Sequence, residues 1–187
     1  MNSAEFWKQF YESHELTLEP SGFAEYVAEI APKASRIIDL GCGNGRDSLF
    51  FANRGFKVLA LDQVQAPGFV HHDNVEFKIL DFRYINDIVL SKNDLIYARF
   101  LFHAIPDEVL HSILNWARGK LFAEFRAFGD VPTIYPDHER VFWKAESFLE
   151  LLEKYNFKVI KFDAAKNRAV YLNEDPLVFR LEAERVG

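Results

Sequence analysis

Short apolar runs alternate with helix-type patterns along most of this 187-residue chain. Five of these runs, rich in Ile, Leu, Val and Phe and bounded by turn residues, span 36–40, 57–61, 75–80, 94–98 and 120–125. Such runs predict strands that are buried on both faces of a sheet, and helices between them predict parallel pairing. The alternation therefore indicates an α/β fold with helices on both faces of a mostly parallel sheet.

Helices and a final pair of strands are expected around this sheet. The expected helices cover an amphipathic segment at 5–11, a segment between Ser21 and Pro32, a segment from Pro106 to near Gly119, and residues 145–155. Serine is a favoured helix N-cap, whereas proline and glycine favour helix ends. The last apolar runs, 157–162 and 177–186, have no clear helix between them, so they predict an antiparallel hairpin. Together these elements predict a seven-stranded sheet with an antiparallel C-terminal strand.

Composition limits the classes of function. A chain of 21.7 kDa has room for one domain with a sizeable core. The net charge of −6 argues against a binder of nucleic-acid backbones, although a few local arginines could still hold a small anion. Cys42 is the only cysteine, so no internal disulfide is possible, and no apolar stretch is long enough for a membrane span or a secretory signal. We therefore expect a cytoplasmic protein.

A glycine-rich turn follows the first predicted strand and runs from Asp39 to Asp47. Glycines there permit positive φ and let a ligand lie against the backbone. A dinucleotide-binding turn would have glycine at the sixth position counted from Gly41, but Arg46 stands there, which argues against a nicotinamide-dependent oxidoreductase. Asp62 ends the second strand 19 residues after Gly43, the separation at which an acid can accept hydrogen bonds from ribose hydroxyls.

This pattern resembles motif I of class I S-adenosylmethionine-dependent methyltransferases, and the resemblance covers about 36–125. It implies a Rossmann-like methyltransferase fold with S-adenosyl-L-methionine as cofactor. In that family the strand-end acid meets the ammonium of the methionine, which Asp39 matches. An acid and an apolar residue after the third strand hold the adenine, which Asp81 and Phe82 match. The cofactor-binding residues implied are Asp39, Gly41, Gly43, Asn44, Gly45, Arg46, Asp47, Asp62, Gln63, Asp81, Phe82, Arg99 and Phe100.

Finer features resemble small-molecule methyltransferases of bacterial capsule and other surface-polysaccharide clusters and, more distantly, tellurite-resistance methyltransferases. These features are Phe6-Trp7, residues 97–100 with His103, Glu124 with Arg126, residues 138–140 and residues 174–176. The resemblance implies four parts of one domain: N-terminal helices over the site (1–35), a cofactor-binding core (36–126), an acceptor-side insertion (127–144), and a C-terminal helix and hairpin (145–187). It also implies O-methylation of a sugar, a sugar phosphate or a related polar acceptor.

The candidate acceptor-binding residues lie after the fourth and fifth strands and at the end of the insertion. They are Arg99, His103, Glu124, Arg126, His138 and Arg140. The cations would suit a phosphate or carboxylate, but they could instead pair with Glu124 and Glu139 and only hold the loop. His103 and His138 are candidate general bases, although a histidine between apolar residues, as His103 is, can equally be a packing residue.

Other chemistries are less well supported by the sequence. An Asn-Pro-Pro-Tyr-like tetrapeptide and a Pro-Cys nucleophile are both missing, which argues against methylation of adenine N6, glutamine or cytosine C5. Residues 71–73, His-His-Asp, have poor spacing for chelation, so no metal site is expected. A non-catalytic sensor or scaffold that binds the cofactor, and a methyltransferase for another small molecule or a metalloid, remain alternatives. The sequence leaves the oligomeric state open.

Overall fold

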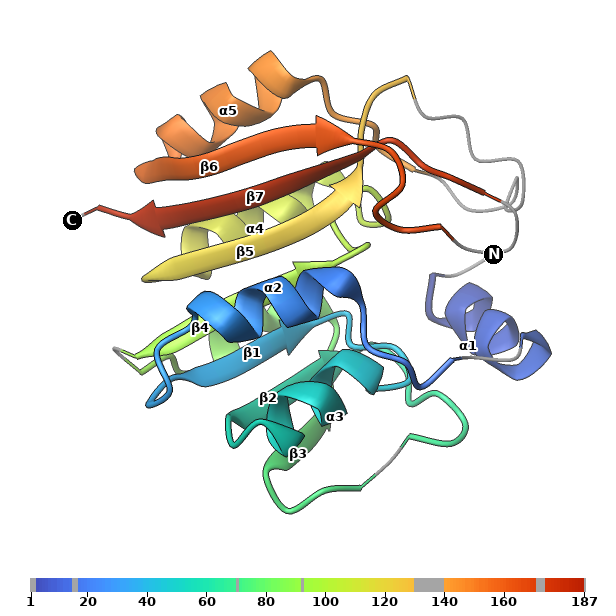
Figure 1. Cartoon of the computed structure of the whole chain (residues 1–187). Coiled ribbons are helices and arrows are strands. Elements are labelled where there is room, and N and C mark those ends of the chain that lie inside the picture. The colour runs from blue at the N-terminus through green and yellow to red at the C-terminus, as the bar shows by residue number, and fades with distance from the viewer. Residues whose placement is uncertain are drawn as a thin grey trace.

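The computed structural model describes residues 3–14, 17–69, 71–91, 93–129, 140–170 and 174–186. They contain a seven-stranded sheet with helices on both faces (Figure 1). The strands are β1 (Arg36–Leu40), β2 (Lys57–Asp62), β3 (Val75–Ile79), β4 (Asp94–Arg99), β5 (Lys120–Arg126), β6 (Phe157–Ala165) and β7 (Val178–Arg185). Their order across the sheet is β3-β2-β1-β4-β5-β7-β6. Strands β1 to β5 pair in parallel, while β7 is antiparallel to both β5 and β6, which confirms the predicted fold class.

Apart from α1, the helices fall on the two faces of the sheet, as shown by the two buried clusters to which their side chains belong. They are α1 (Ser3–Ser13), α2 (Gly22–Ile30), α3 (Arg46–Asn53), the 3₁₀ helix η1 (Phe82–Asp87), α4 (Asp107–Trp116) and α5 (Ala145–Lys154). Helices α2 and α3 pack on one face, where Phe23 and Phe51 contact Tyr97 of β4. Helices α4 and α5 with η1 cover the other face. As expected, Ser21 caps α2: its hydroxyl accepts the backbone N–H of Ala24 at 3.0 Å.

Strand β3 differs from the prediction of burial on both faces. It is an edge strand that pairs only with β2, and Glu76, Lys78 and Ile79 are exposed. An edge position leaves one side of the strand without a neighbour, so polar side chains are tolerated there and help to prevent pairing with another chain. Burial on both faces holds instead for the inner strands β1, β2 and β4.

The topology fixes where a ligand can bind. Strand β1 pairs with β2 on one side and with β4 on the other, so the strand order reverses beside β1. Ligands in open α/β sheets bind outside the carboxyl ends of the strands at such a reversal. Helix α1 lies beyond these carboxyl ends (Figure 1), next to the turn that follows β1.

Candidate active site

A cavity of about 760 Å³ opens at the carboxyl ends of β1, β2, β4 and β5, under α1. Most of the predicted site residues line it: Asp39, Gly41, Gly43, Asn44, Arg46, Asp47, Asp62, Gln63, Asp81, Phe82, Arg99, Phe100, His103, Arg126 and Arg140. Gly45 and Glu124 do not line it. His138, a predicted base, lies outside the described residues, as does Glu139. Site residues that are up to about 100 positions apart in the sequence therefore lie around one cavity. The sequence predicted this, because most of them follow the carboxyl ends of parallel strands.

The glycine-rich turn brings bare backbone to the cavity wall. Gly41 and Gly43 have φ of 70° and 57°, a region that favours glycine. The N–H of Gly41 donates to the carbonyl oxygen of Leu61 at 2.8 Å, which ties the turn to the end of β2. Gly45 has a different task, because a Cβ there would lie 2.5 Å from the Phe69 ring. Gly45 thus allows the turn to pack closely against Phe69, and its predicted contact with the cofactor stays a prediction.

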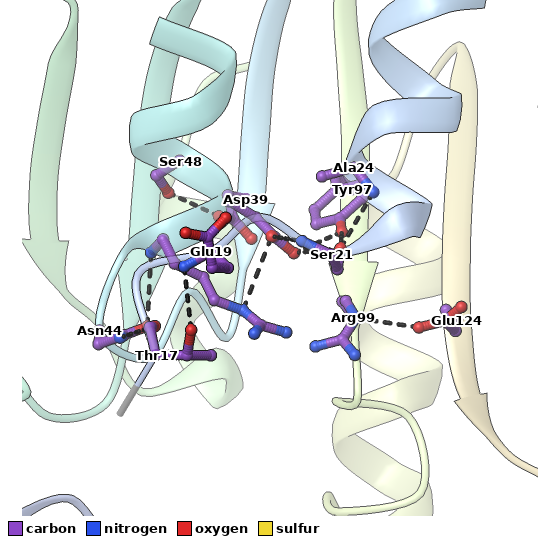
Figure 2. Close-up of polar contacts among 12 residues, drawn as sticks. Thr17, Glu19, Ser21, Ala24, Asp39, Asn44, Ser48, Tyr97, Arg99 and Glu124 are labelled. Carbon is purple, nitrogen blue, oxygen red and sulfur yellow. Dashed lines mark hydrogen bonds and ion pairs between the residues drawn. The ribbon is translucent and has the colours of Figure 1, made fainter. Parts of the chain in front are cut away.

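Two buried carboxyl groups lie beside this turn. Asp39 accepts the Ser48 hydroxyl at 2.6 Å (Figure 2), and burial is the main reason that its pKa rises to about 7. Asp62 accepts the backbone N–H groups of Gly43 at 2.9 Å and Val64 at 3.2 Å. Burial also raises the pKa of Asp62, to about 6, against the effect of those hydrogen bonds. Acids with raised pKa values in a cavity are common at functional sites, since a bound cation or hydroxyl can compensate for lost water.

Asp47, a predicted cofactor ligand, has a second task in the structure. Its carboxylate accepts the N–H and the hydroxyl of Ser21, both at 2.8 Å, and the Tyr97 hydroxyl at 2.7 Å. This buried network joins the start of α2, the start of α3 and the end of β4. Asp47 lines the cavity, but its hydrogen bonds show that it holds α2 against the sheet.

The predicted adenine pair lies at the start of η1. Asp81 caps this helix through the N–H of Arg83 at 3.0 Å and forms an ion pair with the Arg83 guanidinium at 2.5 Å. The hydrogen bond to this guanidinium holds the pKa of Asp81 below its usual value. Phe82 is 6% exposed and packs in the core under the cavity. An apolar wall beside a carboxylate is a suitable surface for a planar base.

The opposite side of the cavity is cationic. Arg99, at the end of β4, donates from Nε to a carboxylate oxygen of Glu124 at 2.9 Å (Figure 2). The other oxygen of Glu124 accepts Nε of Arg180 at 2.7 Å, and Glu124 is fully buried. The structure does not support the predicted contact between Glu124 and an acceptor, because each carboxylate oxygen of this buried residue accepts a hydrogen bond from an arginine. Glu124 instead fixes the position of Arg99.

Phe100 separates the cations on this side. Its φ of 57° is rare for a bulky residue and marks a strained position, as is common in functional sites. Its ring centroid lies 4.7 Å from the Arg99 guanidinium and 5.9 Å from that of Arg126. Arg126 forms an ion pair with Glu174, a pairing that the sequence analysis did not name, while Glu139 lies outside the described residues.

His103 lies next to Arg126 and is 2% exposed. Its Nδ1 is 3.4 Å from the backbone N–H of Arg126, so Nδ1 is the acceptor and the neutral ring carries its proton on Nε2. Its ring is also edge-on to Phe100 at 5.4 Å. In this tautomer the Nε2–H of His103 is able to donate a hydrogen bond, whereas a role as general base at Nε2 requires the proton to move to Nδ1.

Arg46 also contributes positive charge, next to the turn. Burial and the nearby Arg99 lower the pKa of Arg46. Its Nε is 3.8 Å from Asp47, a long ion pair. Two guanidinium groups that repel each other across one cavity favour the binding of an anionic group, such as a carboxylate, near both.

Helix α1 adds Phe10 and Tyr11, two cavity residues that the sequence analysis did not single out. They line the cavity with Trp7, which the sequence analysis named, and Trp7 stacks on Tyr11. The Tyr11 hydroxyl donates a hydrogen bond to Asp62. The available signal was the spacing of these aromatic residues, which places them on one face of the amphipathic segment.

A comparison with models of protein families identifies the family of this chain. A family model described as "Tellurite resistance protein TehB" matches residues 3–117, more than half of the chain. The chain belongs to the TehB family. A search of curated proteins found no match.

Solved structures agree with this TehB assignment at the level of the fold. A SAM-dependent methyltransferase from Anabaena variabilis is 17% identical with a TM-score of 0.70, covering 100% of this chain and 96% of that one. The 1,6-didemethyltoxoflavin-N1-methyltransferase of Burkholderia thailandensis, solved with S-adenosylhomocysteine, is 15% identical with a TM-score of 0.70, covering 99% and 87%. The magnesium protoporphyrin IX methyltransferase of Synechocystis, solved with SAM, is 13% identical with a TM-score of 0.66, covering 100% and 98%. The predicted class is confirmed: this TehB-family chain is a class I S-adenosylmethionine-dependent methyltransferase.

The cavity fits this cofactor by its own geometry. The backbone of the glycine turn forms part of the cavity wall, and a Cβ on Gly41 would lie only 3.1 Å from Leu101. The buried Asp39 and Asp62 lie beside this turn. Acids suit an ammonium and ribose hydroxyls, while Arg46 suits a carboxylate. Among the described residues, no cluster of His, Cys, Asp and Glu could hold a metal ion, and no helix is long and apolar enough to cross a membrane.

Proposed function

We propose that this methyltransferase methylates an oxygen of a small polar acceptor that carries an anionic group, such as a sugar phosphate or a related precursor of a surface glycan. The observation that supports this most is the cationic side of the cavity, where Arg99, Arg126 and His103 lie around Phe100 and Arg140 also lines the wall. These residues stand across the cavity from the predicted adenine pair. The resemblance to surface-polysaccharide methyltransferases supports the sugar, and the arginines support the anion.

In this proposal the residues divide the cavity between two ligands. Asp39, Asp62 and the glycine turn hold the cofactor, which supplies an electrophilic methyl group on a sulfonium. The arginines hold the anion of the acceptor, and the buried Glu124 and the half-buried Glu174 keep two of them in place. Methyl transfer depends on placing the acceptor oxygen in line and on excluding water, which a cavity under a helix favours. His103 would donate a hydrogen bond to the acceptor from Nε2, which leaves His138 as the candidate base.

The test is a screen of purified protein with labelled S-adenosylmethionine. Sugar phosphates and nucleotide sugars should accept label, while the matching neutral sugars should accept at least tenfold less at equal concentration. His138→Ala and Arg126→Ala should lower kcat/KM by tenfold or more and leave cofactor affinity near wild type. If both variants lose activity only in proportion to thermal stability, the side chains hold the loop and do not bind the acceptor.

A metalloid oxyanion is a second candidate acceptor. The matched family is described by tellurite resistance, and a small oxyanion fits the same arginines. Including tellurite in the screen separates the two, since labelled methyl would pass to the oxyanion and S-adenosylhomocysteine would form without any sugar. A sensor or scaffold, the third possibility, would bind the cofactor but release no S-adenosylhomocysteine with any acceptor in the panel.

A further inference from the structure

The aromatic face of α1 lies where the cofactor is expected to bind. Helix α1 stands beyond the carboxyl ends of the strands (Figure 1), and its Tyr11 reaches the turn after β1 and the end of β2. Two independent contacts of the Tyr11 hydroxyl define its place: one is with Asp62 and the other is with Gly43. Both residues belong to the predicted cofactor site.

The first contact is the hydrogen bond from Tyr11 to Asp62. Burial and the charge of Asp62 raise the pKa of the Tyr11 hydroxyl well above its usual value, so the hydroxyl keeps its proton and is the donor. Asp62 also accepts backbone N–H groups from Gly43, Gln63 and Val64. Gly43 donates to one oxygen of Asp62 at 2.9 Å and Val64 donates to the other at 3.2 Å. The phenol is the donor that is not part of the turn backbone, and Tyr11 lines the cavity, so the phenol is the donor that a ribose hydroxyl would replace.

The second contact is steric. A Cβ built on Gly43 would have the Tyr11 hydroxyl oxygen as its nearest neighbour, at 3.4 Å. The hydroxyl thus lies directly over the bare backbone of this glycine. Gly43 has a positive φ and no side chain, so a ligand could approach its backbone closely. In this structure the Tyr11 hydroxyl occupies that space.

We propose that Tyr11 is a gate on the cofactor site: its hydroxyl holds the place of the ribose on Asp62, and it must leave before the cofactor can bind. This proposal rests on the proposed role of Asp62 as the ribose ligand. The chain at Thr17 and Ser21 is fixed, because the Asn44 side-chain amide donates to the Thr17 carbonyl oxygen at 2.8 Å and Ser21 is bound to Asp47. The movement that opens the gate is therefore a movement of α1.

The gate predicts that removing one oxygen atom strengthens cofactor binding. Tyr11→Phe keeps the ring and its stacking on Trp7 but loses the hydrogen bond to Asp62, so the open form becomes more populated. We expect the dissociation constant for S-adenosylhomocysteine, measured by calorimetry, to fall about tenfold, the scale of one hydrogen bond to a charged group. Stopped-flow binding should show faster association.

Tyr26→Phe is the matched control. The Tyr26 hydroxyl donates to Glu182 at 3.4 Å, and Tyr26 does not line the cofactor cavity, so its loss should leave the affinity at the wild-type value. The gate is rejected if Tyr26→Phe raises the affinity for S-adenosylhomocysteine as much as Tyr11→Phe does. It is also rejected if Tyr11→Phe leaves this affinity unchanged or lowers it. A lower affinity would mean that Tyr11 binds the cofactor directly.

A third variant separates failure of the gate from failure of the site. If Asp62→Ala leaves the affinity unchanged, the ribose contact is elsewhere and the proposed site itself is wrong. If Asp62→Ala weakens binding while Tyr11→Phe has no effect, the site stands and only the gate is rejected.

Discussion

Replacing Asp39 by asparagine should stabilise the cofactor-free protein and at the same time weaken cofactor binding. Asp39 is 2% exposed, and its pKa is raised from 3.8 to about 7, chiefly by burial. The folded chain therefore binds a proton that the unfolded chain releases as the pH rises from about 4 to 7. The free energy of unfolding falls with pH wherever the folded state binds more protons.

The size of the effect follows from the pKa difference. A shift of about three units corresponds to roughly 4 kcal/mol at 1.36 kcal/mol per unit, which is an upper bound for a buried group. Asparagine does not ionise, and its side-chain oxygen can still accept the Ser48 hydroxyl, now at 2.6 Å from Asp39. The variant should therefore match the wild type near pH 4 and exceed it by up to about 4 kcal/mol at pH 8.

Urea unfolding at several pH values measures this difference directly. Asp94→Asn is a suitable contrast, because Asp94 is equally buried but forms an ion pair with Arg36 at 2.6 Å, so its neutralisation should destabilise the protein at pH 8. In parallel, Asp39→Asn should bind S-adenosylmethionine at least tenfold more weakly, because the ammonium loses its carboxylate. The reasoning is wrong if Asp39→Asn shows the same pH slope as the wild type or is the less stable protein at pH 8.

Three further substitutions test single contacts in the site. Gly43→Val should abolish cofactor binding in calorimetry while circular dichroism shows a folded protein, because the new side chain fills the space over the turn; unchanged affinity would exclude this turn as the site. Asp62→Ala should weaken binding by about 1.5 to 3 kcal/mol, the scale of a hydrogen bond to a charged group, and a change below tenfold would place the ribose elsewhere. Arg126→Lys should impair turnover of an anionic acceptor nearly as much as Arg126→Ala, because lysine lacks the planar fork; activity close to wild type would favour a neutral acceptor.

The local sequence was sufficient to predict most of the fold. Strand ends and helix caps depend on neighbouring residues, so the turn at 39–47 and the start of α2 at Ser21 were predicted where the structure has them. Strand β3 was misjudged because its apolar content does not reveal that it lies at an edge. Edge position depends on strand order, which short-range patterns do not encode.

The site was predicted less completely, because its polar partners are far apart in the chain. Asp47 binds Ser21 and Tyr97, which are 26 and 50 residues away, and no spacing rule connects them. Glu124 was expected to face an acceptor, but the distant Arg180 takes one of its oxygens. Similarly, Tyr11 contacts Asp62 only because α1 folds over the strand ends. Long-range pairing of this kind requires the three-dimensional structure.

The most direct test of the central claim is the yield of S-adenosylhomocysteine from S-adenosylmethionine in the presence of the acceptor panel, followed by mass spectrometry of the acceptor. The account predicts that an anionic sugar gives equal amounts of S-adenosylhomocysteine and an acceptor heavier by one methylene unit, and that Gly43→Val gives neither. Tight binding of the cofactor without product from any acceptor would contradict it and would favour a sensor or a scaffold.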